Sequence, residues 1–137
     1  MHQMSGSGAK DRLQRIRSAW PNRGWTWDER TGCVASSFPA ESQDEYERVL
    51  SQLFSTRWEH RNVARAPATL ARLVERTGGL RSGQWLFSPR DCSDIFPYAL
   101  WWPWGDDTTV SVRLGMAPDS STCRASVREL FGVDSDV

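Results

Sequence analysis

Residues 98–116 read YALWWPWGDDTTVSVRLGM, and this stretch decides the fold of the chain. Three of the eight tryptophans of the protein lie within four positions here, namely Trp101, Trp102 and Trp104. Apolar and polar residues alternate with a period of two from residue 108 to residue 116, which is typical of a β-strand. Gly105 and the two aspartates that follow it are turn-forming residues. The stretch therefore predicts a β-hairpin with a large hydrophobic content.

A three-residue turn over residues 105–107 predicts the register of this hairpin. It places Leu100 opposite Val112 and Trp102 opposite Val110, so that the apolar side chains share one face. A shift of the register by one residue would move every one of these side chains to the other face. The residues expected to hold the fold together are Leu100, Trp102, Trp104, Val110, Val112 and Leu114.

The opposite face of the predicted hairpin carries Trp101 and Arg113, together with Pro103 and Ser111. If helices cover only one face of the sheet, these four residues lie on the open face. Interaction hot spots are enriched in exposed Trp and Arg side chains, so this face is the candidate binding site. Two alternatives remain open, a second packed layer over Trp101 or a Trp–Arg stack that shields itself.

The rest of the chain adds helices and shorter strands. Apolar residues recur at helical spacing over residues 10–20, 42–58, 67–77 and 118–131. Alternation predicts a first hairpin of residues 25–27 and 33–38, and a single strand over residues 84–87. Because only the connector 59–66 separates the two central helices, they are expected to form an αα-hairpin.

This order of elements predicts an α+β fold. About five antiparallel strands, two hairpins plus one strand, are expected with four helices, which lie mainly on one face of the sheet. A single domain is predicted over residues 10–132, because 137 residues suffice for one core. Residues 1–9 are expected to form a disordered tail, and residues 133–137 a frayed one.

The three cysteines, Cys33, Cys92 and Cys123, are widely spaced and contain no CxxC pair. This spacing argues against a disulfide framework or a zinc cluster, and no metal or cofactor is predicted. The N-terminal residues show no apolar signal-peptide stretch, and the longest uncharged apolar run, residues 99–104, is too short to cross a bilayer. The cytoplasm is therefore the expected location, and no membrane partner is expected.

Charge is unevenly distributed along a chain whose formal net charge is zero. Residues 57–90 contain seven arginines and two glutamates, a net charge of +5, whereas residues 91–137 have a net charge of −5. Clustered arginines bind phosphates, so this segment is a candidate site for nucleic acid or another polyanion. The residues at helical spacing are Arg57, Arg61, Arg65, Arg72 and Arg76. Against this interpretation, the chain lacks a glycine-rich phosphate loop and any known recognition motif.

Catalytic residues are sparse. His60 is the only histidine outside the N-terminal tail, and it would have to act as the base for a nucleophile. Cys92 is the weak candidate for that nucleophile, with Asp94 as the third member of a triad. No local motif supports this trio, so a cysteine hydrolase is the third interpretation.

The composition favours a small non-enzymatic protein that binds another protein through the aromatic–arginine face. By analogy of size and tryptophan content, inhibitors and toxin-neutralising immunity proteins of bacteria are the closest subclass. Nucleic-acid or polyanion binding is the alternative function. The oligomeric state and the strand order are not determined by these patterns.

Overall fold

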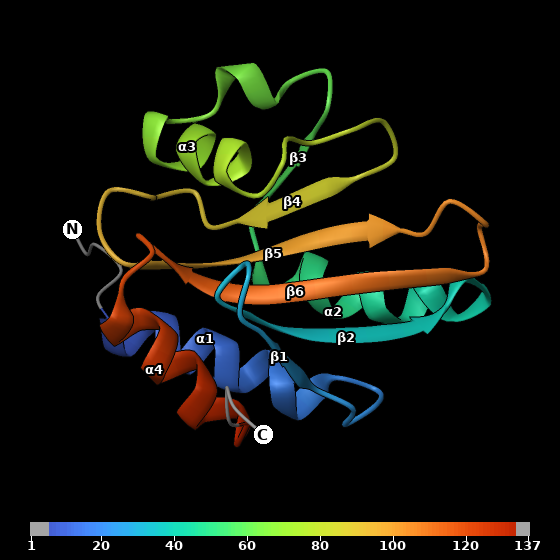
Figure 1. The fold of residues 1–137 in the computed structure, drawn as a ribbon, viewed down its shortest axis with the longest axis horizontal. Coiled ribbons are helices and arrows are strands. Elements are labelled where there is room, and N and C mark those ends of the chain that lie inside the picture. Colours follow the sequence, from blue (N-terminus) through green and yellow to red (C-terminus); the bar gives the residue numbers. More distant parts are fainter. Residues whose placement is uncertain (1–5, 134–137) are drawn as a thin grey trace.

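The computed structural model describes residues 6–133, and six β-strands pair there into one antiparallel sheet (Figure 1). The strands are β1 (Thr26–Asp28), β2 (Cys33–Pro39), β3 (Thr56–Glu59), β4 (Trp85–Ser88), β5 (Phe96–Pro103) and β6 (Thr109–Ala117). Their order across the sheet is β1-β2-β6-β5-β4-β3. The long hairpin of β5 and β6 thus lies at the centre, as its hydrophobic content requires.

Four α-helices accompany the sheet within the described residues. They are α1 (Gly6–Ala19), α2 (Gln43–Leu53), α3 (Ala68–Arg76) and α4 (Ser121–Phe131). Two short 3-10 helices, η1 (Ala40–Ser42) and η2 (Val63–Arg65), join them to the strands. The predicted α+β class, the four helices and the antiparallel pairing are confirmed, and the sheet has one strand more than expected.

The additional strand is β3, which replaces the end of a predicted helix. The helix expected over residues 42–58 ends at Leu53, and Phe54 already has an extended backbone. Thr56–Glu59 then pairs with β4, with Trp58 opposite Leu86. Threonine and tryptophan fit a pleated, half-buried surface well, so pairing with β4 outweighs continuation of the helical periodicity.

The helices cover the two faces of the sheet unequally, which creates two hydrophobic cores. The larger core joins α1, α2 and α4 to one face, where Val34, Phe38, Trp101 and Val112 are buried. The smaller core joins α3 to the other face. Helices thus lie mainly on one face, but α2 and α3 lie on opposite faces and do not form the expected αα-hairpin, because β3 intervenes.

The register of the central hairpin differs by one residue from the predicted one. Trp101 is opposite Val112 and Trp102 is opposite Ser111. The turn is longer than expected, because the amide of Trp104 donates to the carbonyl of Thr109 at 2.8 Å and leaves four residues in the loop. The added loop residue shifts β5 by one position against β6. Each β5 side chain therefore lies on the face opposite to the predicted one.

The shifted register buries Trp101, which has an exposed fraction of 1%. Its ring lies 5.2 Å from that of Trp85 and 5.5 Å from that of Phe38, between centroids. The prediction that Trp101 lies on an open face is therefore wrong. The expected core position of Trp104 is also wrong, since this residue is 51% exposed at the turn.

The described part of the N-terminus also departs from prediction. Residues 6–9, expected in a disordered tail, form the first turn of α1, and Ala9 is buried in the larger core. The tails expected at residues 1–5 and 134–137 lie outside the described residues.

Substitution of Trp101 tests the register. We expect Trp101→Ala to lower the free energy of unfolding by about 3–5 kcal/mol, because it opens a large cavity in the core. Trp104→Ala removes the same side chain from an exposed position and is expected to change stability by less than about 0.5 kcal/mol. Urea denaturation of both variants measures the difference. A larger loss for Trp104→Ala would mean that the predicted register, not the observed one, is correct.

Candidate functional site

Half of the sheet face on which α3 packs is not covered by any helix of the described residues. The smaller core joins α3 to β4 and β5, and Cys33 is the only β2 residue in that core. Further along β2 on this face, Ala35 is half-buried, and Ser37 and Pro39 are exposed. We call this surface, formed by β1, β2 and the adjoining parts of β6 and β5, the open half-face. Its floor has small side chains, so a partner can approach the backbone closely.

A tryptophan–arginine pair lies at the border between the open half-face and the smaller core. The guanidinium carbon of Arg113 is 4.8 Å from the ring centroid of Trp102, a cation–π contact. Arg113 also donates from Nε to a carboxylate oxygen of Asp28 at 2.9 Å, and from Nη1 to the hydroxyl of Ser111. Three partners therefore hold the Arg113 side chain in one position.

Asp28 joins the β1–β2 turn to this pair. Its carboxylate accepts the bond from Arg113, a second from the hydroxyl of Thr31 at 2.9 Å and a third from the amide of Arg30 at 3.1 Å. Partial burial raises the pKa of Asp28, but the hydrogen bonds from Arg113 and Thr31 and the charge of Arg113 outweigh it, so the net pKa lies below its usual value. Asp28 therefore stays ionised at neutral pH and keeps Arg113 in place.

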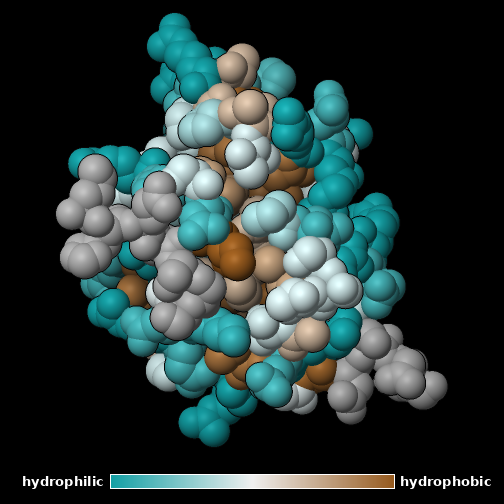
Figure 2. Space-filling model, turned by 90° about the vertical axis from the view of Figure 1, so that its left-hand side faces the viewer, coloured by the Kyte–Doolittle hydropathy of each residue, from teal (hydrophilic) through white to brown (hydrophobic). Residues whose placement is uncertain are grey.

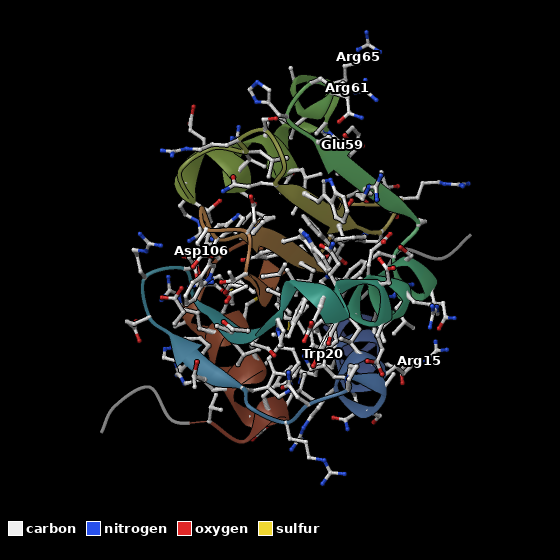
Figure 3. The ribbon with its side chains drawn as sticks, turned by 90° about the vertical axis from the view of Figure 1, so that its right-hand side faces the viewer. Arg15, Trp20, Glu59, Arg61, Arg65 and Asp106 are labelled. Atoms are coloured by element: carbon white, nitrogen blue, oxygen red, sulfur yellow. The ribbon has the colours of Figure 1, made fainter. Side chains whose placement is uncertain are left out.

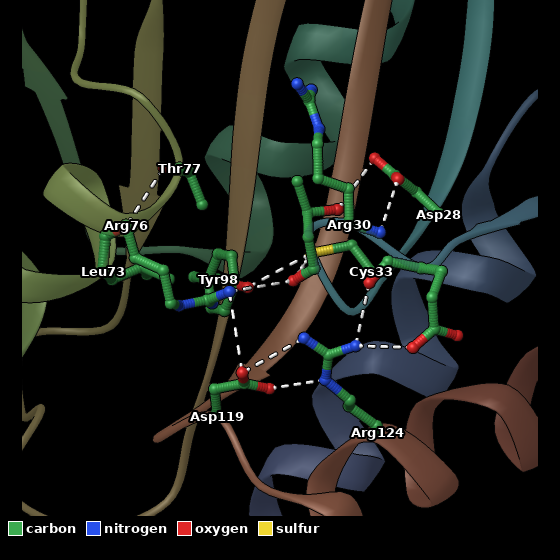
Figure 4. A network of polar contacts seen from close by, with 11 residues as sticks. Asp28, Arg30, Cys33, Leu73, Arg76, Thr77, Tyr98, Asp119 and Arg124 are labelled. Carbon is green, nitrogen blue, oxygen red and sulfur yellow. Dashed lines mark hydrogen bonds and ion pairs between the residues drawn. The ribbon is translucent and has the colours of Figure 1, made fainter.

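A second polar network closes one end of the open half-face (Figure 4). The carboxylate of Asp119 accepts hydrogen bonds from Nε and Nη2 of Arg124 at 2.8 and 3.1 Å. Arg76 of α3 forms an ion pair with the same carboxylate at 3.7 Å, and Arg124 also donates to the carbonyl of Glu29 at 2.9 Å. The hydrogen bonds from Arg124, together with the positive charges of Arg76 and Arg124, lower the pKa of Asp119 although partial burial opposes them. The network thus ties α3, α4 and the β1–β2 turn together.

Two buried side chains, Cys33 and Tyr98, lie beneath this network. The sulfur of Cys33 is 3.1 Å from the hydroxyl of Tyr98. Burial raises the pKa of the Cys33 thiol, and it raises the pKa of Tyr98 well above its usual value. Both groups are therefore neutral at physiological pH. An uncharged, fully buried thiol is a structural group rather than a nucleophile.

A small cleft lies beside this network, between α3 and the connection from β6 to α4. Its volume is about 220 Å³, and Leu73 and Pro118 contribute to its walls together with Arg72 and Arg76. Figure 2 faces the side of the molecule on which β6 leads into α4, and hydrophobic surface there is confined to small areas between hydrophilic residues.

The four residues predicted as a binding face are separated by the observed register. Arg113 and Ser111 do lie together on the open half-face, although Ser111 is buried beneath its neighbours with 6% exposure. Trp101 and Pro103 lie on the opposite face, because alternate residues of β5 point to opposite sides. The aromatic partner of Arg113 is Trp102. Sequence reasoning also missed Asp28, since no local pattern connects it with a residue 85 positions away.

The arginines predicted to follow one helical face belong to several elements. Arg57 lies in β3, Arg61 in the following turn and Arg65 in η2, so the first three do not share a helix. Arg72 and Arg76 are both in α3, as expected. Arg57, Arg61 and Arg65 would share one helical face only if the helix of residues 42–58 continued, and the chain instead forms β3 after α2.

The three candidate catalytic residues show no contact with one another within the described structure. Cys92 is buried and donates to the carbonyl of Pro89 at 3.5 Å. Burial raises the pKa of its thiol, which is opposite to the change that activates a cysteine nucleophile. One ring nitrogen of His60 is 2.8 Å from the carbonyl oxygen of Leu80, and Asp94 is exposed. Cys92, His60 and Asp94 thus gain no geometric support as a triad.

Comparison with known proteins gives no match to a family model, to a curated protein or to a solved structure. Among the described residues, no helix combines the length and hydrophobicity needed to span a membrane. No group of three or more His, Cys, Asp or Glu side chains in this part of the chain is arranged to hold a metal ion. The open half-face is therefore the feature from which a function can be inferred.

Substitution of Gly115 tests the packing below the polar network. A Cβ atom at Gly115 would lie 2.7 Å from the hydroxyl of Tyr98 and 2.8 Å from the sulfur of Cys33. We expect Gly115→Ala to lower the free energy of unfolding by about 1–3 kcal/mol, because the core is overpacked. The matched control is Gly105→Ala, where a Cβ meets nothing within 4 Å. Equal stability of the two variants in urea denaturation would contradict the packing described for Cys33 and Tyr98.

Proposed function

We propose that the protein is a non-enzymatic module that binds another protein through the open half-face. The observation that carries this proposal is the pair of Trp102 and Arg113 at the border of an uncovered sheet surface, fixed by Asp28. Tryptophan and arginine are the side chains that contribute most to protein–protein binding energy. The small residues beside them supply a floor on which a partner can pack.

Preorganisation favours this pair as a binding determinant. Immobilising a long side chain at an interface costs about 0.5–1.5 kcal/mol. Arg113 is already held by Asp28, Ser111 and Trp102, so most of that cost is met within the folded protein. Nε1 of Trp102 is buried and has no hydrogen-bond acceptor among the described residues. If the indole moved slightly toward the surface, its N–H could donate a hydrogen bond to an acceptor on the partner protein.

Trp104 extends the proposed surface to the turn between β5 and β6. It is the one large hydrophobic residue among those described that is exposed, with 51% of its surface accessible. It continues the alternation of β5 from Trp102, so it belongs to the same side of the hairpin. A partner that covers the open half-face and this turn would bury both tryptophans.

An inhibitor or toxin-neutralising immunity-type protein is the subclass that we propose within protein binding. It is supported by the small size of the chain, the eight tryptophans and the absence of an assembled catalytic triad among the described residues. Cys33, Cys92 and Cys123 are free thiols, which agrees with the proposed cytoplasmic location.

A capture experiment tests the proposal. The tagged protein is used to capture partners from a lysate of the cells in which it occurs, and captured proteins are identified by mass spectrometry. Ser37→Arg places a bulky side chain on the exposed floor of the open half-face, and Trp104→Ala removes the exposed aromatic ring. We expect each variant to reduce capture of the specific partner at least tenfold without a change in melting temperature.

The matched control for Ser37→Arg is Ser51→Arg, which makes the same substitution at an exposed position on α2. This control is expected to capture the partner as the unmodified protein does. If Ser37→Arg and Ser51→Arg captured the partner equally well, the open half-face would not be the binding site. Failure of the unmodified protein to capture any specific protein would contradict the proposed function as a whole.

A further inference from the structure

The arginine-rich segment forms one continuous layer at the end of the molecule opposite α1 and α4 (Figure 1). Residues 57–90 build β3, η2, α3 and β4, and they contain seven arginines against only Glu59 and Glu75. A segment with this composition has a strong positive potential unless acidic residues from elsewhere in the fold approach it. The ion pairs of the structure show how far such neutralisation goes.

Two of the arginines are neutralised. Arg57 forms ion pairs with Glu47 at 3.5 Å and with Glu59 at 3.4 Å, and its guanidinium carbon lies 4.1 Å from the ring centroid of Trp85. Arg76 pairs with Asp119 at 3.7 Å. These contacts use one of the two glutamates of the layer, and they assign Arg57 and Arg76 to structural roles.

Four other arginines of the layer have no such partner. Their side chains are exposed, and their guanidinium groups make no hydrogen bond or ion pair with any described residue. These residues are Arg61, Arg65, Arg72 and Arg81; the seventh arginine, Arg90, is exposed beyond the end of β4. Figure 3 shows two of them, Arg61 and Arg65, projecting outward from the apex of the layer. Glu75 is the only carboxylate of the layer that remains to offset them.

Apart from Glu47 and Asp119, no described carboxylate from elsewhere in the fold forms an ion pair with an arginine of this layer. A chain of 137 residues has a radius of gyration of about 14 Å, whereas the Debye length at physiological ionic strength is about 8 Å. Asp106, in the turn between β5 and β6, lies well away from Arg61 and Arg65 (Figure 3). The zero net charge of the chain thus includes a net charge of +5 over residues 57–90 and of −5 over residues 91–137.

From these unpaired charges we propose that the arginine-rich layer of residues 57–90 binds the phosphate backbone of nucleic acid. The inference is independent of protein binding at the open half-face. Arginine suits this role because its planar guanidinium can donate two parallel hydrogen bonds to a phosphate. Four such groups on one layer give the density of positive charge that displaces counterions from a nucleic acid.

The aromatic side chains of the layer exclude base stacking as the main contribution. Nε1 of Trp58 donates to the hydroxyl of Ser88 at 3.1 Å, and its ring packs against the smaller core. The face of Trp85 is occupied by the guanidinium of Arg57. Binding should therefore depend on phosphates and be independent of sequence, with dissociation constants of about 10⁻⁴–10⁻⁶ M at physiological salt.

Fluorescence anisotropy with labelled single-stranded and duplex DNA tests this proposal across a range of salt concentrations. For single strands, contact with four phosphates predicts that log K falls against log salt with a slope of about −3. Arg61→Gln combined with Arg65→Gln removes two contacts, so the magnitude of the slope should fall by roughly 1.4. The melting temperature is recorded for each variant to confirm that it is folded.

The matched control combines Arg15→Gln with Arg48→Gln. Both arginines are exposed and form no ion pair with a described residue, and they lie on α1 and α2, outside residues 57–90. Figure 3 shows Arg15 far from Arg61 and Arg65. This control changes the net charge by the same amount and is expected to leave the slope unchanged. Equal slopes for the two double variants would overturn the proposal.

Two other results would also overturn it. The first is no binding of either DNA at low salt. The second is retention on heparin without binding to DNA, which would identify a surface that binds sulfated polyanions but not nucleic acid. Neither outcome affects the capture experiment at the open half-face, so the two proposals fail separately.

Discussion

The rest of the structure depends on burial of β5 on both of its faces. Phe96 through Trp101 are all buried, with one half of these residues facing α1, α2 and α4 and the other half facing α3. Trp101 packs between Phe38 and Trp85 in the larger core, while Leu100 belongs to the smaller one. A strand of this kind leaves no solvent-exposed face along most of its length.

This constraint explains where the accessible surfaces are. Three helices pack on one face, and α3 packs on the other face over β4 and the adjoining parts of β3 and β5. The remaining area stays open, and Arg113 lies at its border with Trp102. The network of Arg76, Asp119 and Arg124 fixes α3 relative to α4 and the β1–β2 turn, so the open half-face has a defined edge.

The class of the fold could be predicted from the sequence because the strongest patterns are local. The central hairpin, the first hairpin and the helix that follows Pro67 all have the expected positions. The register could not be predicted in the same way. Both Trp101 and Trp102 are apolar, so alternation cannot decide between the faces when both are covered, and the four-residue turn decides it instead.

The candidate site illustrates the same limit. The exposure of arginines in the layer of residues 57–90 could be expected, because the seven arginines outnumber the two glutamates of that segment. The contact of Trp102 with Arg113 depends on the register of the central hairpin. The contact of Asp28 with Arg113 depends on the pairing of β2 with β6, which brings the β1–β2 hairpin beside Arg113. Local periodicity contains no information on such long-range pairing. The positions of Asp28 and Trp102 in the site could therefore be found only from the structure.

The most direct test of the central claim is an NMR measurement of cross-strand nuclear Overhauser effects in the β5–β6 hairpin. The structure predicts backbone contacts between Trp101 and Val112 and between Ala99 and Leu114. Contacts between Trp102 and Val110 and between Leu100 and Val112 would show the register that places Trp101 on the opposite face. Observation of that second set would contradict the two-core architecture and the open half-face built on it.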